Sequence, residues 1–409
     1  MDTPTRLLIY SHDSFGLGHL RRCRAIAHHL VERYKNLSVL ILSGSPIIGS
    51  FDFKARVDFV RVPGVIKLRN GDYTPLQLHI DIEQTLAIRS SIIRHTAEVF
   101  DPHLFLVDKE PLGLRGEVRD TLLDLKHRGA RLVLGLRDVM DDPATLYGEW
   151  RRKNAFPALY DLYDEIWVYG LPQIFDPLRE LPGMAPLAGK VAFTGYLRRP
   201  LPEVPPTVPA HELPGEPYIL VTPGGGGDGE DLIDWVLRAY EADGPNLPHP
   251  ALLVFGPFMA LERRIEFTER ASRLERVHAL TFEARFERLI EGAVGVVAMG
   301  GYNTFCEILS FGKPALIVPR TRPRQEQALR AERAARLGLV RVLPDDGRRG
   351  AGVMAAMLRE LPHWPPPDAA GVAGLLDGLE RITELCRPWL GHESIAVDEA
   401  EPRRASLGG

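Results

Sequence analysis

The chain has 409 residues, of which 45% are hydrophobic and 25% are charged, and its formal net charge is −4. This length is too great for one small core and predicts two domains. The weakly acidic balance provides no global basic field, which argues against nucleic acid as a partner.

The first half of the chain alternates short apolar runs with longer amphipathic ones. Strands are predicted at residues 6–10, 38–42, 59–62, 104–107, 131–136, 165–168 and 191–194. Helices are predicted at about 19–34, 76–99 and 116–128, with a further helix end at 160–163. Apolar residues of the first helix recur at three-and-four spacing, which is typical of a helix with one buried face. Strands that alternate with helices predict a doubly wound parallel sheet.

A proline-rich segment, residues 199–217, interrupts this alternation and is interpreted as a linker, because proline blocks both helices and strand ladders. A second series of alternating elements follows the linker. Its strands are predicted at 218–222, 251–255, 277–280, 294–299, 315–318 and 340–343. Its helices are predicted at 230–240, 261–274, 284–291, 352–361 and 367–385, with two more between residues 301 and 338.

The predicted fold class is therefore α/β, with two doubly wound, Rossmann-like domains facing an interdomain cleft. We expect an N-terminal domain at 1–198, the linker at 199–217 and a C-terminal domain at 218–390. The polar tail, 391–409, is expected to be disordered. Ligands of such sheets bind beyond the carboxyl ends of the strands, so both sheets should contribute to one cleft.

Three glycine turns follow predicted strands, at residues 16–18, 224–227 and 300–301. Gly18, Gly224, Gly225 and Gly226 are candidates for binding phosphate, because free N–H groups and the helix dipole attract anions at such turns. A flexible turn is the alternative interpretation. The sequence lacks both the Gly-Lys-Ser/Thr of a P-loop and the spaced glycines of a dinucleotide site.

The turn at Gly300 and Gly301 is the second phosphate candidate, together with Asn303 and Thr304 of the following helix. Either of these two residues can cap that helix, and Thr304 and Glu307 have capping-box spacing. The Glu307 carboxylate has two interpretations at this point. It can accept hydrogen bonds from the ribose hydroxyls of a nucleotide, or it can complete the capping box.

Glu326 and Gln327 open the helix that follows the strand at 315–318. A carboxylate beside an amide supplies both donors and acceptors, which suits the hydroxyl groups of a sugar. A solvated helix N-terminus, where acidic charge is favourable, is the alternative.

His19 lies at the start of the first helix, where the helix dipole lowers the pKa of a histidine and keeps it neutral. It is the candidate general base, and a polar cap is the alternative. Asp13, Asp108 and Asp138 lie at or near strand ends and face the same way. We take Asp108 and Asp138 as further catalytic candidates, although each is equally well a turn or cap residue.

Short blocks of the sequence resemble the GT-B glycosyltransferases of family 28, whose best-known member is the bacterial peptidoglycan GlcNAc transferase. In the C-terminal half the blocks are GGYNTFCE, GKPALIVP and EQALRAERAARLG. The N-terminal GLGHLRR is similar to the family's glycine-rich loop, and more similar still to the G-x-G-H-x-x-R of the nucleotide-sugar hydrolase of pseudaminic acid synthesis. The segment from Thr194 to Arg198 resembles the T-G-N-P-V-R that closes the family's N-terminal domain. The architecture matches from about Arg6 to Leu385.

The resemblance implies a role for each candidate. Glu307 would bind the donor ribose, Glu326 and Gln327 would bind the donor sugar, and the two C-terminal glycine turns would hold the diphosphate. His19 would act as base on an acceptor hydroxyl, or on water if the enzyme is a hydrolase. The sequence departs from the family at Arg330, where an asparagine is usual, and at Tyr302, within the glycine turn.

The implied function is an inverting, metal-independent transfer of a sugar from a nucleotide donor, expected to be UDP-linked, to an acceptor hydroxyl. No cofactor is expected beyond this co-substrate, and the acceptor can be a saccharide, a lipid or a small molecule. Two alternatives stay open. One is a nucleotide-sugar hydrolase or 2-epimerase on the same fold, and the other is a non-catalytic protein that binds nucleotide sugars.

The expected location is the cytoplasm. Three scattered cysteines favour a reducing compartment and argue against disulfides or a zinc site. No signal peptide or membrane span is expected from the sequence. The loop from Arg61 to Pro75 mixes apolar and basic residues and is a candidate for contacting the acceptor or the inner face of the membrane. Ordinary packing of this loop is the alternative.

Overall fold

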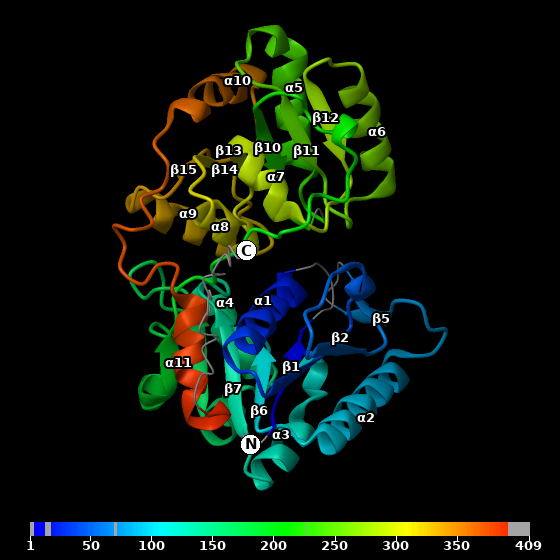
Figure 1. Cartoon of the computed structure of the whole chain (residues 1–409), viewed down its shortest axis with the longest axis vertical. Coiled ribbons are helices and arrows are strands. Elements are labelled where there is room, and N and C mark those ends of the chain that lie inside the picture. Colours follow the sequence, from blue (N-terminus) through cyan, green and yellow to red (C-terminus); the bar gives the residue numbers. More distant parts are fainter. Residues whose placement is uncertain (1–3, 13–17, 69–71, 226, 392–409) are drawn as a thin grey trace, which may run out of the picture.

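The computed structural model describes residues 4–12, 18–68, 72–225 and 227–391, which form two parallel sheets in two domains (Figure 1). Three predictions fall outside these residues: the candidates Asp13 and Gly16, the phosphate candidate Gly226, and almost all of the tail at 391–409. The expected α/β fold, with two doubly wound domains, is confirmed by the two parallel sheets.

The N-terminal sheet has seven parallel strands in the order β3-β2-β1-β6-β7-β8-β9. The strands are β1 (Thr5–Ser11), β2 (Leu37–Ser43), β3 (Val57–Arg61), β6 (Leu104–Asp108), β7 (Arg131–Arg137), β8 (Glu165–Tyr169) and β9 (Val191–Phe193). They are almost continuously apolar, as expected for parallel strands covered on both faces. The covering helices are α1 (Gly18–Arg33), α2 (Ile82–Phe100), α3 (Arg119–His127) and α4 (Pro143–Arg152).

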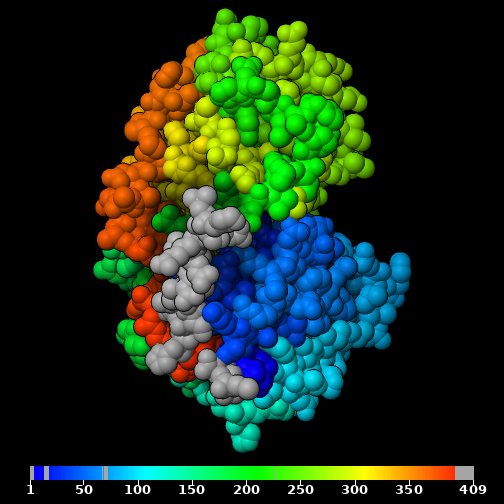
Figure 2. Space-filling view, viewed as in Figure 1, coloured from blue at the N-terminus to red at the C-terminus, as the bar shows by residue number. Residues whose placement is uncertain are grey.

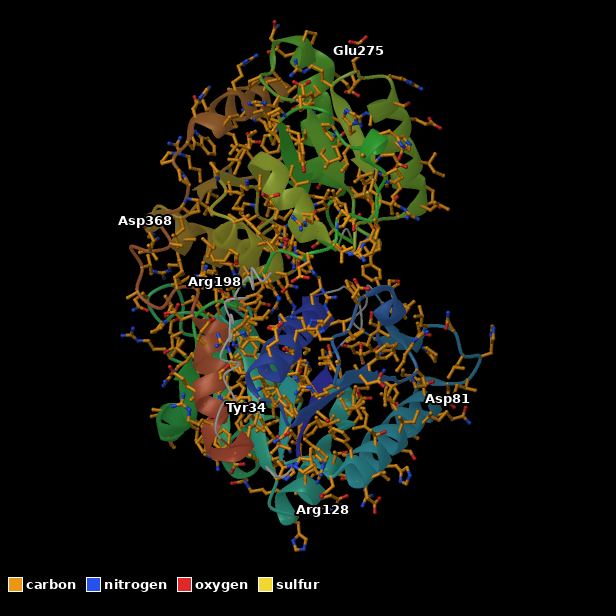
Figure 3. The ribbon with its side chains drawn as sticks, in the orientation of Figure 1. Tyr34, Asp81, Arg128, Arg198, Glu275 and Asp368 are labelled. Carbon is orange, nitrogen blue, oxygen red and sulfur yellow. The ribbon has the colours of Figure 1, made fainter. Side chains whose placement is uncertain are left out.

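Helix α2 begins six residues later than predicted. The Asp81 side chain accepts a hydrogen bond from Gln84 N (2.7 Å) and caps the helix (Figure 3). The preceding residues form a short antiparallel hairpin, β4 (Val65–Lys67) and β5 (Tyr73–Pro75). Val65 is buried and packs in a small cluster with Leu86, whereas Leu68 is 44% exposed. The loop proposed to contact a membrane is therefore packed at Val65 and exposed at Leu68.

The C-terminal sheet has six parallel strands in the order β12-β11-β10-β13-β14-β15. The strands are β10 (Tyr218–Thr222), β11 (Ala251–Val254), β12 (Val277–Leu280), β13 (Ala293–Ala298), β14 (Ala315–Ile317) and β15 (Arg341–Val342). The helices are α5 (Glu230–Asp243), α6 (Leu261–Ser272), α7 (Phe286–Gly292), α8 (Tyr302–Ser310), α9 (Glu326–Arg336) and α10 (Ala351–Glu360). In Figure 2 a notch separates this domain from the N-terminal domain on the right of the view.

Helix α8 begins directly after the glycine turn, with Gly301 as its N-cap residue and no side-chain capping bond. The predicted capping by Asn303 or Thr304, and the capping box with Glu307, are therefore wrong. Asn303 and Thr304 lie inside the helix, which already begins at Tyr302. Gly300 has φ +77°, and a Cβ there would lie 2.8 Å from the Ile317 side chain, so the tight turn before the helix requires glycine. The first N–H groups of α8 are left without a side-chain acceptor from the cap.

The last helix, α11 (Gly378–Leu390), corrects both the predicted helix at 367–385 and the C-terminal domain end at residue 390. Residues 364–377 form no α-helix, because three prolines and the glycines that follow them cannot sustain one. The chain crosses back here, and α11 packs against α1 of the N-terminal domain (Figure 1). Tyr34, near the end of α1, donates a hydrogen bond to the Thr383 carbonyl (2.8 Å; Figure 3).

None of the helices in the described parts of the chain combines the length and the apolar character needed to cross a membrane.

Candidate active site

His19 and Asp108 are brought together because β1 and β6 are neighbouring strands of the N-terminal sheet. His19 lies in the first turn of α1, and Asp108 is the last residue of β6, which pairs with β1. His19 Nδ1 and Asp108 Oδ2 form a short hydrogen bond. Since a carboxylate can only accept, we assign the proton to Nδ1, which leaves Nε2 as a proton acceptor.

Arg22 completes this cluster. Its guanidinium donates from Nε to Asp108 Oδ1 (2.8 Å) and from Nη2 to Oδ2 (2.7 Å). The arginine is one helical turn after His19, so the G-x-G-H-x-x-R spacing places both side chains on one carboxylate. Burial would raise the pKa of Asp108, but Arg22 and His19 outweigh it and hold this pKa below the ordinary value. Asp108 is therefore ionised and orients the histidine.

Burial lowers the pKa of His19 to about 4, although Asp108 opposes the shift. The imidazole is thus neutral at physiological pH. A neutral imidazole, oriented by a buried carboxylate through Nδ1, has the form of a general base.

His19 lies in the wall of a cavity of about 270 Å³ between the two domains. The N-terminal domain contributes Gly18, His19 and Arg137, among others. The opposite wall comes from the loops at the carboxyl ends of β10, β11, β13 and β14, as expected for ligands of doubly wound sheets. The cavity therefore brings the candidate base to the loops that were predicted to bind phosphate.

The glycine turn after β10 forms one side of this cavity. Gly224 has φ +92°, and its N–H is bonded to the Thr222 hydroxyl (3.1 Å). Gly256 of the neighbouring loop lies so close that a Cβ there would be 2.4 Å from the Gly224 carbonyl oxygen. Gly224 and Gly225 both face the cavity. Here the glycines permit close packing of two loops as well as approach to a ligand.

The first turn of α8 forms the adjoining wall, with Gly301, Asn303 and Thr304. Asn303 spans the domains, because its Nδ2 donates to the Gly18 carbonyl (3.0 Å) and its Oδ1 accepts from Arg199 Nη2 (2.7 Å). Gly300 does not line the cavity. Its carbonyl instead accepts a hydrogen bond from Arg330 Nη1 (3.0 Å).

Glu326 and Gln327, at the start of α9, both line the cavity. Arg320 joins the pair: its side chain binds Glu326 Oε1, and its backbone N–H donates to Gln327 Oε1 (3.1 Å). Glu326 Oε2 is buried with no hydrogen-bond partner in the described part of the chain. Burial would raise the pKa of Glu326, but Arg137 and Arg320 lower it below the ordinary value. An ionised carboxylate oxygen is thus available beside an amide.

Glu307 is fully buried and does not line the cavity, because Arg21 of the N-terminal domain covers it. Arg21 donates to Glu287 Oε1 (2.8 Å) and lies at ion-pair distance from Glu307 Oε1. Neither Glu307 oxygen has a well-aligned donor among the described residues. Burial raises the pKa of Glu307 to about 7, while Arg21 lowers the pKa of Glu287 despite burial. One guanidinium thus contacts two buried carboxylates, and its single charge can balance only one of them.

Asp138 is a predicted catalytic candidate, but it does not lie in the wall of the cavity. It is fully buried, does not line the cavity, and accepts hydrogen bonds from Arg330 Nε (2.7 Å), Arg330 Nη2 (2.6 Å) and the Tyr196 hydroxyl (2.7 Å). Its carboxylate is therefore committed to an ion pair between the domains. This ion pair also explains why the chain departs from the family at Arg330, since the arginine side chain binds Asp138 of the other domain.

Arg137 is the main cavity residue that the sequence analysis missed. It ends β7, beside Asp108 at the end of β6, and lines the cavity. The Nε of Arg137 is buried and has no hydrogen-bond partner among the described residues. Burial lowers its pKa to about 10. In the sequence, the only indication of this role is that Arg137 ends a predicted strand. An arginine at a strand end is more often solvated than in a binding site.

Within the described residues, no group of three or more His, Cys, Asp or Glu side chains is arranged to hold a metal ion.

Two facing doubly wound domains, with a cavity between the carboxyl edges of their sheets, define the class: this is the architecture of GT-B glycosyltransferases. Comparison with known families agrees, because residues 220–363 match the glycosyltransferase family 28 C-terminal domain. The resemblance inferred from the sequence is thus confirmed for this domain. The matched domain and the fold together confirm the expected enzyme class, a glycosyltransferase.

Solved structures extend the likeness to both domains. The chain is similar to the glycotransferase of kitacinnamycin, with 16% identity, a TM-score of 0.62, and coverage of 95% of this chain and 100% of that one. Phytolacca americana UGT2, complexed with UDP-2fluoro-glucose and pterostilbene, has 17% identity, a TM-score of 0.57 and 94% coverage of both chains. Acinetobacter baumannii MurG has 12% identity, a TM-score of 0.55 and coverage of 94% and 100%. No curated protein matches the sequence.

Proposed function

We propose that the protein is an inverting, metal-independent glycosyltransferase that moves a sugar from a UDP donor to an acceptor hydroxyl. The observation that carries the proposal is the His19–Asp108 pair, which faces the glycine turn after β10 and the N-terminus of α8 across one cavity. The choice of UDP draws on the UDP-sugar named in the complex of the plant enzyme.

In the proposed reaction, His19 Nε2 removes the proton of the acceptor hydroxyl. The hydroxyl oxygen attacks C1 of the donor sugar from the face opposite the diphosphate. The bond between C1 and the phosphate oxygen breaks, its electron pair leaves with the diphosphate, and the configuration at C1 inverts. The proton then resides on the imidazole, where the ionised Asp108 stabilises it.

The negative charge that develops on the diphosphate is met by fixed groups of the protein. The first N–H groups of α8 and the positive end of its dipole lie in the cavity wall with Gly301, Asn303 and Thr304. Arg137 adds a guanidinium from the opposite domain. Such preorganised groups contribute strongly to catalysis, because they need no reorganisation as charge develops.

Glu307 is the proposed partner of the donor ribose, so Arg21 must leave it when a nucleotide binds. We expect Glu307→Ala to weaken UDP binding by about 10- to 100-fold, the effect of losing hydrogen bonds to a charged group. Calorimetric titration with UDP measures this. Titration with 2′-deoxy-UDP is the control. This ligand lacks one ribose hydroxyl, so Glu307→Ala should reduce its affinity less than it reduces the affinity of UDP. An unchanged UDP affinity would show that Glu307 does not contact the ribose.

A screen of nucleotide sugars by nucleotide release, with and without lipid and saccharide acceptors, tests the proposed reaction. Acceptor-dependent UDP release supports transfer. Free sugar and UDP formed without acceptor would instead identify a hydrolase, which the G-x-G-H-x-x-R spacing makes the second candidate. Interconversion of the donor sugar would identify an epimerase, and binding without turnover a nucleotide-sugar binding protein.

The proposed location is the cytoplasm, where nucleotide sugars are available as donors. Peripheral contact with the inner face of the membrane is proposed in addition, through the exposed Leu68, which directly follows the first strand of the β4–β5 hairpin. Membrane fractionation with and without added salt distinguishes the two.

A further inference from the structure

Arg21 of α1 contacts two carboxylates of the other domain through a single nitrogen atom. Its Nη2 donates a hydrogen bond to Glu287 Oε1 of α7 (2.8 Å) and lies 2.5 Å from Glu307 Oε1 of α8. Only the bond to Glu287 is well aligned, because both oxygens of Glu307 lack a hydrogen-bond partner among the described residues. Glu287 is therefore the better partner of Arg21, and Glu307 is the weaker one.

The side chain of Arg21 also forms part of the wall of the donor cavity. It lies beside Phe286, whose ring centroid is 5.9 Å from the guanidinium carbon, and both residues line the cavity. Glu307 lies behind this wall, with its side chain 0% exposed, whereas the side chain of Arg21 is 14% exposed. A ligand in the cavity can thus reach Glu307 only after Arg21 has moved.

Glu307 is poorly satisfied by its contact with Arg21. An ionised carboxylate has about four acceptor positions, and a buried carboxylate that lacks donors is destabilised. The two neighbouring hydroxyl groups of a ribose would supply two donors in place of one misaligned N–H group. Glu287, by contrast, is held ionised, because Arg21 lowers its pKa although burial would raise it. Glu287 can therefore retain Arg21 after the arginine leaves Glu307.

We propose that Arg21 is an autoinhibitory residue, which competes with the donor ribose for Glu307 and is displaced onto Glu287 alone when the donor binds. This inference rests on the proposed function, because it takes Glu307 as the partner of the ribose. Breaking the contact between Arg21 and Glu307 reduces the apparent affinity for the donor. UDP is also the product of the proposed reaction, so the return of Arg21 to Glu307 favours its release after transfer.

Paired calorimetric titrations with UDP and 2′,3′-dideoxy-UDP test the proposal on the full chain. The two ligands share their base and diphosphate. The dissociation constant of 2′,3′-dideoxy-UDP divided by that of UDP, here called the ribose ratio, therefore isolates the contribution of the hydroxyl groups. At pH 9 Glu307 is ionised, since burial raises its pKa only to about 7. Arg21→Ala should raise the ribose ratio at least fivefold, because Glu307 is then free to bind the hydroxyl groups.

Glu287→Gln should change the ribose ratio in the opposite direction. Without the charge of Glu287, Arg21 pairs with Glu307 alone and competes more strongly with the hydroxyl groups, so the ratio should fall below that of the wild type. A general loss of packing at this contact would instead move the ratio in the same direction in both variants. Thermal melts of each variant monitor folding.

Arg33→Ala is the matched control, because Arg33 is exposed near the far end of the same helix and does not line the cavity. It should have the ribose ratio of the wild type. If Arg21→Ala leaves the ratio unchanged or lowers it, Arg21 does not compete with the ribose, and the autoinhibition is overturned. Equal losses of affinity for both ligands would be one such result and would assign Arg21 to the diphosphate.

The titration of Glu307→Ala with UDP separates this inference from the proposed function. If that variant loses affinity for UDP while Arg21→Ala keeps the ribose ratio of the wild type, the ribose assignment stands and only the autoinhibition fails. If Glu307→Ala binds UDP as tightly as the wild type does, the ribose assignment itself is wrong, and the autoinhibition fails with it.

Discussion

Replacing His19 by alanine should lower kcat by about 10²- to 10⁴-fold, the range that a general base contributes. UDP affinity should be unchanged, because His19 is proposed to act on the acceptor. The measurement is steady-state nucleotide release, with the donor and acceptor found in the screen, together with UDP titration. A variant that retains the wild-type kcat would show that another group removes the proton.

The pH dependence gives an independent readout of the same residue. Only neutral His19 can accept a proton, so kcat/KM should fall as the pH drops through the pKa of His19, which burial lowers to about 4. The Asp108 carboxylate raises this pKa, so Asp108→Asn should move the fall to still lower pH. It should also reduce kcat, since the side chain that holds Nδ1–H is altered. The fall should be absent in His19→Ala. A thermal melt of each variant monitors folding.

Replacing Asp138 by alanine should destabilise the protein by about 3–5 kcal/mol, because it leaves the buried Arg330 guanidinium without its partner. Arg330→Ala should have a similar effect, and the double variant should cost less than the sum of the two singles. Urea denaturation of all three variants gives the interaction energy.

The exposed pair Arg94–Asp124 provides a control for this measurement. Its side chains are 56% and 42% exposed, so breaking it should cost no more than about 1 kcal/mol. If Asp138→Ala and Asp124→Ala had equal effects, the buried pair would not stabilise the domain contact.

The sequence identified the features of the cleft that depend on local geometry. Strand ends, glycine turns and helix starts can be read from short windows, and they placed His19, Gly224 and Glu326 at the cavity. The sequence predicts only that His19 and Asp108 lie at the same edge of the N-terminal sheet. It does not predict their contact, because the two residues are 89 positions apart. Their contact depends on the neighbouring positions of β1 and β6 in the sheet.

Side-chain contacts between the domains could not be predicted from the sequence. Asp138 and Arg330 are 192 residues apart. In the sequence each lies close to a strand end or a helix start, where a residue that lines the cleft is equally expected. Arg21 lies on the same helix as Arg22, yet it covers Glu307 while Arg22 binds Asp108. Such partners are decided by how two complete domains face each other. The same holds for α11, whose apolar face could belong to either domain.

The return of the chain at α11 means that the polypeptide passes between the domains twice, and the two passages lie side by side. Tyr196 N donates to the Leu375 carbonyl (2.7 Å), and Gly378 N donates to the Tyr196 carbonyl (3.2 Å). Opening of the cleft must keep both passages intact, so its rotation axis runs close to them. A single protease cut within residues 199–217 would therefore leave the halves associated in a native gel and release two fragments only in detergent.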